Sequence, residues 1–225
     1  MTSSNLKIIA CLIMLIDHIG VLLFPQYFLL RIIGRLAFPI FAFLIVEGYF
    51  HTKDLKKYFI RLGLFAMLSE VPFDRAFNHA WLEFGSQNVF FTLFIGLIAI
   101  AIYDKYARKS LVIAVVGTML CVMLNALVRG DYSMIGVLVI LGFYHYRNQQ
   151  IKILLWLLII NGIYVALQVS NLDQLTLRAS AQLFELLALP IIFVYNGKKG
   201  LRLKYLFYIF YPTHLLILYT ITLMN

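Results

Sequence analysis

Long apolar runs, separated by short polar connections, follow one another along almost the whole chain. Most of them approach the ~20 residues that an α-helix needs to cross the hydrocarbon core of a bilayer. They predict an all-α fold: a polytopic integral membrane bundle of about nine transmembrane helices in a single domain, residues 1–225. The expected spans are residues 6–24, 28–50, 58–72, 88–103, 111–128, 133–146, 153–169, 180–195 and 205–224.

The composition supports this class. The chain is 63% hydrophobic and 13% charged, with a mean hydropathy of +0.90. This proportion of apolar residues is larger than a soluble domain can bury. Cys11 and Cys121 both fall in apolar spans, where we expect small core residues rather than a disulfide or a metal pair. The first run is too long for a signal peptide and no small-residue cleavage site follows it, so we expect a permanent span.

The net charge of +9 has its main cause in the connections between spans. Lysines gather in alternate connections, whereas the other connections hold only scattered arginines. The clusters are Lys53, Lys56 and Lys57; Lys105, Arg108 and Lys109; Arg147 and Lys152; and Lys198, Lys199, Arg202 and Lys204. By the positive-inside rule the N-terminus is expected in the cytoplasm. The excess of basic residues is then explained by the orientation of the protein in the membrane and by contact with anionic lipids. The chain has no basic stripe with interleaved aromatic residues that would indicate a nucleic-acid partner.

Two ionisable residues, Asp17 and His18, lie inside the first apolar run. Such groups cost several kcal/mol in hydrocarbon unless they are paired or line a wet cavity, so they are candidates for function. The alternative is that they only join the first helix to a neighbour, through interhelical hydrogen bonds worth about 0.6 kcal/mol on average.

Other ionisable residues extend this pair into a column. Lys7 shares a helix face with His18 and lies roughly 16 Å from it at 1.5 Å per residue. We expect the cytoplasmic half of the column to hold Lys7, Glu47, Lys57 and Arg61, and the outer half Asp17, His18 and Arg35. Fixed cations at the mouth suit a phosphorylated donor, and a histidine at the far end suits general base chemistry. A proton or ion pathway would use similar residues, so this pattern is compatible with an enzyme and with a transporter.

Further polar residues are candidate contacts for an acceptor: Glu70 and Asn88 at span ends, and His214 near the middle of the last span. For Asn88 the alternative is helix capping together with Thr92, and Asp131 is expected to cap the helix over 133–146. The connection over 73–87 is expected to lie in the membrane interface, with Trp81 at headgroup level. The chain has no Gly-rich phosphate loop, HExxH pair or GxSxG elbow, which argues against an NTP-driven pump, a zinc protease and a serine hydrolase.

Five stretches in this order closely resemble the TraX family: LKIIACLIMLIDHIG, GRLAFPIFAFLIVEGYFHTKDLKKYFIRL, NVFFTLFIGL, DYSMIGVL and FYPTHLLIL. The resemblance covers nearly the whole chain, and the family's name-giving member is associated with N-acetylation of conjugative pilin. A more distant likeness is to the acyltransferase-3 membrane enzymes. Their first span carries a basic residue, ten intervening residues and a histidine, as Lys7 and His18 do.

The resemblance implies an acetyltransferase of the bacterial cytoplasmic (inner) membrane that moves an acetyl group from acetyl-CoA to an amine or hydroxyl. The acceptor would be a pilin or peptide N-terminus or another envelope molecule. By the distant likeness His18 is the catalytic residue and Arg61 belongs to an arginine cluster that faces the acyl-CoA phosphates. The chain departs from that pattern because Glu47 replaces a serine before Gly48, and because the arginine pair is reduced to Lys57 and Arg61.

The residues and the resemblance together predict one site. Its catalytic residues are His18, Asp17 to orient it, and Arg35 to stabilise an oxyanion or hold a carboxylate. The acetyl-CoA contacts are Lys7, Lys57, Arg61 and Glu47; the acceptor contacts are Glu70, Asn88 and His214; no metal is expected. Two alternatives are a small proton-coupled secondary transporter, disfavoured because the chain has no inverted repeat, and a noncatalytic assembly factor for an exported peptide.

Overall fold

The computed structural model describes residues 1–168, 181–201 and 204–224. Within these residues every regular element is a helix, and one isolated β-bridge joins Gln87 to Gly130, which confirms the predicted all-α class. The elements are α1 (Ser3–Leu22), α2 (Phe28–Gly34), α3 (Ala37–His51), α4 (Leu55–Leu68), α5 (Glu70–Phe77), α6 (Val89–Tyr106), α7 (Leu111–Leu127), α8 (Ser133–His145), α9 (Gln150–Gln168), the 3-10 helix η2 (Gln182–Leu187), α11 (Ala188–Phe193) and α12 (Lys204–Met224).

Five helical segments of the described chain are long and apolar enough to cross a membrane, and three shorter ones are apolar. The long ones are Ser3–Leu22, Phe28–His51, Val89–Tyr106, Gln150–Leu167 and Tyr205–Met224; the short ones are Leu111–Leu127, Ser133–His145 and Gln182–Phe193. The predicted span over 58–72 is interrupted, because α4 ends at Leu68 and α5 begins at Glu70. Residues 169 and 180, Arg202 and the side chain of Lys204 lie outside the described part. Nine spans and a cytoplasmic N-terminus stay predictions.

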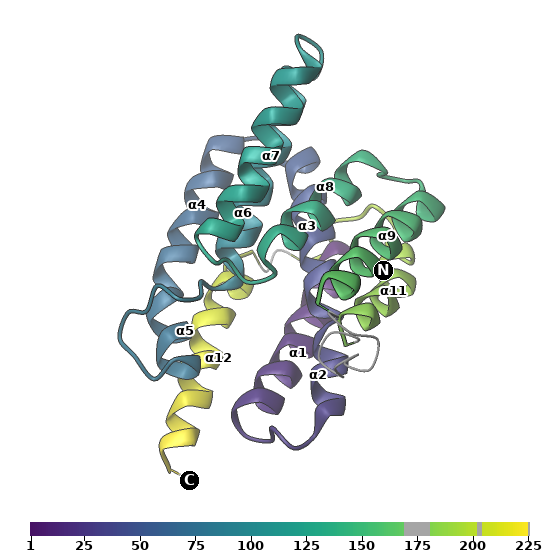
Figure 1. Cartoon of the computed structure of the whole chain (residues 1–225). Helices are drawn as coiled ribbons and strands as arrows, with labels where there is room; N and C mark the ends of the chain where they lie inside the picture. The colour runs from purple at the N-terminus through teal and green to yellow at the C-terminus, as the bar shows by residue number, and fades with distance from the viewer. Residues whose placement is uncertain (169–180, 202–203, 225) are drawn as a thin grey trace.

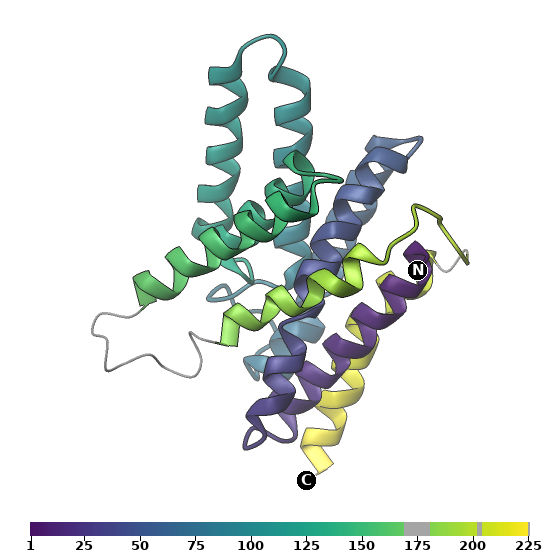
Figure 2. The same ribbon diagram turned by 90° about the vertical axis from the view of Figure 1, so that its right-hand side faces the viewer.

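Several connections of the bundle lie at two opposite ends (Figures 1 and 2). The α3–α4 and α6–α7 connections lie at one end, whereas the α1–α2 connection and the C-terminus lie at the other. The first two connections and their flanks carry the lysine clusters around Lys56 and Lys105, so two clusters of the predicted alternation share an end. Helices α1 and α12 pack side by side and run in the same direction.

The second long segment is broken into α2 and α3 at Arg35. The backbone N–H of Arg35 donates to the carbonyls of Arg31 and Ile32, 3.2 and 3.3 Å away, as the helix tightens before it ends. Pro39 has no N–H to donate to the Arg35 carbonyl four residues earlier, so a regular helix cannot continue through this point. The break leaves Arg35 between the two helices.

A short backbone bridge closes the other side of the same region. Gln87 donates its N–H to the Arg129 carbonyl at 2.9 Å, and Asp131 donates to the Gln87 carbonyl at 3.0 Å. The Thr92 hydroxyl donates to the carbonyl of Asp131. These bonds hold the α7–α8 connection against the start of α6.

In the connection before the bridge, the ring of Trp81 is 69% exposed, and the guanidinium of Arg75 of α5 stacks on it.

Candidate functional site

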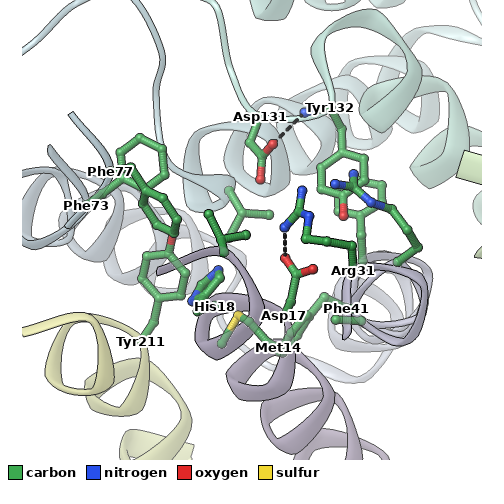
Figure 3. Close-up of a pocket in the computed structure, with 16 residues that line it drawn as sticks. Met14, Asp17, His18, Arg31, Phe41, Phe73, Phe77, Asp131, Tyr132 and Tyr211 are labelled. Atoms are coloured by element: carbon green, nitrogen blue, oxygen red, sulfur yellow. Dashed lines mark hydrogen bonds and ion pairs between the residues drawn. The ribbon is translucent and has the colours of Figure 1, made fainter. Parts of the chain in front are cut away.

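A cavity of about 240 Å³ lies where α1, α2, the start of α3, α5, the start of α6, the α7–α8 connection and α12 meet (Figure 3). Its lining consists of charged residues set among aromatic rings: Met14, Asp17, His18, Val21, Arg31, Gly34, Arg35, Ala37, Phe38, Phe41, Phe73, Phe77, Val89, Asp131, Tyr132 and Tyr211. The three residues that the sequence predicts to be catalytic, His18, Asp17 and Arg35, all line it. Their roles stay predictions, but their common location is a finding.

Asp17 is paired with Arg31. Its Oδ2 accepts a hydrogen bond of 2.7 Å from the Arg31 guanidinium, as the dashed line in Figure 3 marks. Its Oδ1 is buried without a hydrogen-bond partner in the described chain and faces Gly34, where any Cβ would collide with the carboxylate. Asp17 was expected to orient His18, but the described chain shows no hydrogen bond between these two side chains: the Asp17 carboxylate is bonded to Arg31, and His18 to His214.

His18 pairs instead with His214 of α12. The two ring nitrogens, His18 Nδ1 and His214 Nε2, are 2.7 Å apart. The ring centres are 4.9 Å apart and the ring planes differ by 7°. Parallel rings stacked face to face would have their centres closer together, whereas this distance is reached when the two nitrogens lie on the line between the centres. The rings therefore meet edge to edge in nearly one plane. His214 was expected as an acceptor contact, and the structure places it behind His18 rather than on the cavity wall.

Arg35 has weak polar partners. Its Nη1 lies 3.4 Å from Gln182 Oε1, and its guanidinium lies 5.9 Å from the ring centre of Tyr132. Behind it runs a buried chain of hydrogen bonds, in which Glu185 accepts from Gln182 at 2.6 Å and from Asn161 at 2.5 Å. This chain of hydrogen bonds was not predicted from the sequence, although each of its three residues is a polar interruption of an apolar run.

Asp131 is a cavity residue that the sequence analysis assigned to helix capping. The N-cap position of α8 is Tyr132, which makes no side-chain cap hydrogen bond, so that expectation was wrong. The Asp131 carboxylate accepts from the Tyr132 backbone N–H at 3.1 Å (Figure 3). Asp131 is exposed to solvent and lies near the Arg35 guanidinium.

A second group of charges lies outside the cavity lining. Lys7 lies 5.5 Å from the ring centre of Phe207 and within the electrostatic reach of Arg61 and Lys199. Arg61 lies between the rings of Tyr58 and Tyr208, 5.4 and 5.3 Å from their centres, and its Nε is buried without a hydrogen-bond partner in the described chain.

The other two predicted acetyl-CoA contacts do not join this group. The Lys57 side chain is 81% exposed and pairs with Asp54 at 3.2 Å. Glu47 accepts a hydrogen bond of 2.7 Å from Arg147 Nε and lies 3.6 Å from the ring of His51. The sequence placed Glu47 with Lys57 and Arg61 by depth, but a buried carboxylate takes the cation within reach, here an arginine a hundred residues later.

The remaining acceptor candidates, Glu70 and Asn88, are bonded to each other away from the cavity lining. The Asn88 side-chain amide donates to Glu70 and, at 2.8 Å, to the carbonyl of Ala66. Its Oδ1 accepts from the Phe90 N–H at 3.0 Å and so caps α6. The capping alternative for Asn88 is confirmed, and the pair joins the α4–α5 break to the start of α6.

These features define a helical membrane protein with a charged, histidine-containing cavity between its helices. The model of the family described as "TraX protein" matches residues 2–222, and the chain belongs to this family. It is similar to the "Probable fimbrial assembly protein FimC, serogroup H1" of Dichelobacter nodosus, with 31% identity over 95% of this chain and 93% of that protein. It is also 31% identical to an uncharacterised protein of Rickettsia prowazekii (strain Madrid E), over 47% of this chain and 38% of that protein. No solved structure matches the chain.

Proposed function

We propose that this chain is an integral-membrane acetyltransferase that moves an acetyl group from acetyl-CoA to an amine or hydroxyl. The observation that carries the proposal is the position of His18 on the wall of the charged cavity, with Nδ1 bonded to His214. One ring nitrogen is thus engaged and the other has no hydrogen-bond partner in the described chain, and a general base needs such a free nitrogen.

Arg35 supports the same reaction. It lines the cavity with His18, and the hydrogen bond that its guanidinium makes to Gln182, the only one this group makes in the described part of the chain, is long at 3.4 Å. A guanidinium with donors to spare stabilises the negative charge that develops on a thioester carbonyl oxygen during acyl transfer. The pairing of Arg31 with Asp17 leaves this task to Arg35.

The chemistry balances with these two residues. His18 takes the proton from the N–H or O–H group of the acceptor. At the same time the nitrogen or oxygen of the acceptor forms a bond to the acetyl carbonyl carbon. The bond between that carbon and the coenzyme A sulfur then breaks, and the proton passes from His18 to the sulfur, which leaves as a thiol. Arg35 interacts with the carbonyl oxygen while it carries negative charge.

The donor would be held by Lys7, Arg61 and Lys199. These cations attract the coenzyme A phosphates, and Lys7 lies on the same helix as His18, roughly 16 Å away at 1.5 Å per residue. The extended pantetheine arm of coenzyme A separates its phosphates from the thioester. One donor molecule can therefore contact the cations with its phosphates and reach His18 with its thioester. Lys57, which is exposed and paired with Asp54, has a smaller part in this proposal.

The name of one relative supports our choice of acceptor class. The relative from Dichelobacter nodosus is named as a probable fimbrial assembly protein, and it matches this chain over nearly its full length. A fimbrial or pilin subunit, or a peptide with a free N-terminal amine, is therefore the acceptor that we propose first. Other envelope molecules with a hydroxyl are the second choice.

Acetyl-CoA binding to the purified protein in lipid nanodiscs tests the proposal. We expect saturable binding by calorimetry, and acetylation of a synthetic pilin N-terminal peptide by mass spectrometry. The same peptide with a blocked N-terminus is the control for amine transfer. A transporter would instead show proton or solute flux in sealed vesicles without acetyl-CoA, and an assembly factor would show neither. Absence of both acetyl-CoA binding and product overturns the proposal.

A further inference from the structure

The two histidines of the cavity region form a directed pair. His214 Nδ1 lies 2.7 Å from the carbonyl oxygen of Phe210, one turn earlier on α12. A carbonyl has no proton to give, so His214 Nδ1 must donate. In a neutral imidazole this leaves a lone pair on His214 Nε2, the atom that faces His18. The proton between the two rings therefore belongs to His18 Nδ1.

The other helical histidines show that His18 is the exception. His51 and His145 each contact the carbonyl four residues earlier through Nδ1, at 2.8 and 2.9 Å. This is the contact that His214 makes within its own helix. His18 makes its Nδ1 contact to His214 across the helix pair instead, so its tautomer depends on a residue 196 positions away.

We propose that His214 is a positioning residue that selects the tautomer of His18 with the proton on Nδ1 and the lone pair on Nε2. The inference rests on the proposed function, in which His18 Nε2 accepts the acceptor's proton. Once Nε2 is protonated, the bond from Nδ1 to His214 becomes charge-assisted, and such bonds are roughly twice as strong as neutral ones. His214 thus both prepares the base and stabilises its charged form.

The surrounding rings hold this geometry. Phe77 and Tyr211 meet the His18 ring edge to face, with centres 5.3 and 6.0 Å away. Phe210 lies nearly parallel to His214, with centres 4.7 Å apart. A ring flip of His18 would break the bond to His214 and disturb these packed contacts, so the tautomer and the orientation are selected together.

Nitrogen-15 NMR of the histidines in the full chain, in nanodiscs near neutral pH, tests the tautomer directly. The protein has five histidines, and single substitutions at the others assign His18. The wild type should show His18 protonated at Nδ1 only. In His214→Leu, which keeps bulk but has no acceptor, we expect the Nε2-protonated form to appear. In His214→Gln the side-chain oxygen can accept the bond, and the wild-type tautomer should be largely kept.

Acetyl transfer to the pilin N-terminal peptide should follow the tautomer. His214→Leu should lower turnover by between ~10² and ~10⁴, the range for loss of a general base, and His214→Gln should restore part of it. Binding of acetyl-CoA should change little in either variant. This pattern separates positioning from a general loss of structure.

Two NMR results overturn the inference: a wild-type His18 protonated at Nε2, or a His214→Leu protein that keeps the wild-type tautomer. If His214→Leu does not fold, the wild-type and His214→Gln spectra still test the inference. A His214→Gln protein in which His18 is no longer protonated at Nδ1 would also count against the inference. If the tautomer is as stated but no protein acetylates any peptide, the proposed function fails and the assignment of the protons stands.

Discussion

The carboxylate of Asp17 accepts a hydrogen bond of 2.7 Å from Arg31, and this ion pair joins α1 to α2 at the wall of the cavity. The pair is partly shielded, with 18% of the aspartate side chain and 30% of the arginine side chain exposed. Because Arg31 takes the carboxylate, Arg35 one turn later has no ion pair within 4.0 Å in the described chain. Two arginines at the spacing of one helical turn thus differ in what they can offer a substrate.

Replacement of His18 by alanine should lower acetyl transfer by between ~10² and ~10⁴, because the proposed base is lost. Membrane insertion and acetyl-CoA binding should change little. His145→Ala is the matched control, since His145 is also a helical histidine but is bonded to its own helix at Leu141 and does not line the cavity. Transfer of acetyl to a pilin N-terminal peptide is the measurement. Full activity in the His18→Ala protein would remove His18 from the reaction.

Arg35→Lys should lower turnover strongly while acetyl-CoA binding survives. Lysine keeps the charge but lacks the planar fork that presents several donors to one oxygen. Arg108→Lys at the exposed α6–α7 connection is the control for a generic arginine effect. Turnover and acetyl-CoA affinity are measured on the same preparations. Equal turnover in the two variants would show that the Arg35 fork contributes nothing, and flux through vesicles that depends on Arg35 without acetyl-CoA would favour a transporter.

Gly34→Ala should lower both thermal stability and acetyl transfer. A Cβ at Gly34 would collide with the Asp17 carboxylate and push α1 away from α2, and such overpacking typically costs about 1–3 kcal/mol. Gly162→Ala is the control, because nothing lies within 4 Å of a Cβ built there, in the middle of α9. This control should be neutral or stabilising, since alanine favours helix. Melting temperatures in detergent decide, and equal melting temperatures would mean that α1 and α2 do not depend on this close approach.

Much of the fold could be predicted from the sequence, because apolar runs of bilayer length have few alternatives to helix. The predicted boundaries fail where a serine or a proline interrupts a run. Ser69 ends α4, and Pro39 removes the N–H that would carry the second span through Arg35. The predicted span over 58–72 therefore becomes two helices, and the second span becomes a broken one.

The three residues predicted to be catalytic do lie together, but neither their partners nor the places of the other predicted contacts could be predicted. Depth along each helix placed Asp17, His18 and Arg35 at one level, and they do share a cavity. Depth does not say which way a side chain points around the helix axis, so the partners Arg31 and His214 were not identified. Asp131 was missed for a related reason: the backbone bridge from Gln87 that turns its connection towards the cavity leaves no mark in local sequence.

Arg61→Ala should weaken acetyl-CoA binding more than Lys57→Ala, although the two cations lie one turn apart on α4. Arg61 is held between Tyr58 and Tyr208, with a buried Nε that has no hydrogen-bond partner in the described chain, and it acts electrostatically on Lys7. Lys57 is 81% exposed and already paired with Asp54, so water and salt screen its charge. Calorimetry at two salt concentrations measures both effects. The Arg61→Ala protein should bind acetyl-CoA more weakly and with less dependence on salt, because a contact to phosphate has been removed. An unchanged affinity in Arg61→Ala, or an equal loss in the two variants, would place the donor's phosphates away from the group of Lys7, Arg61 and Lys199.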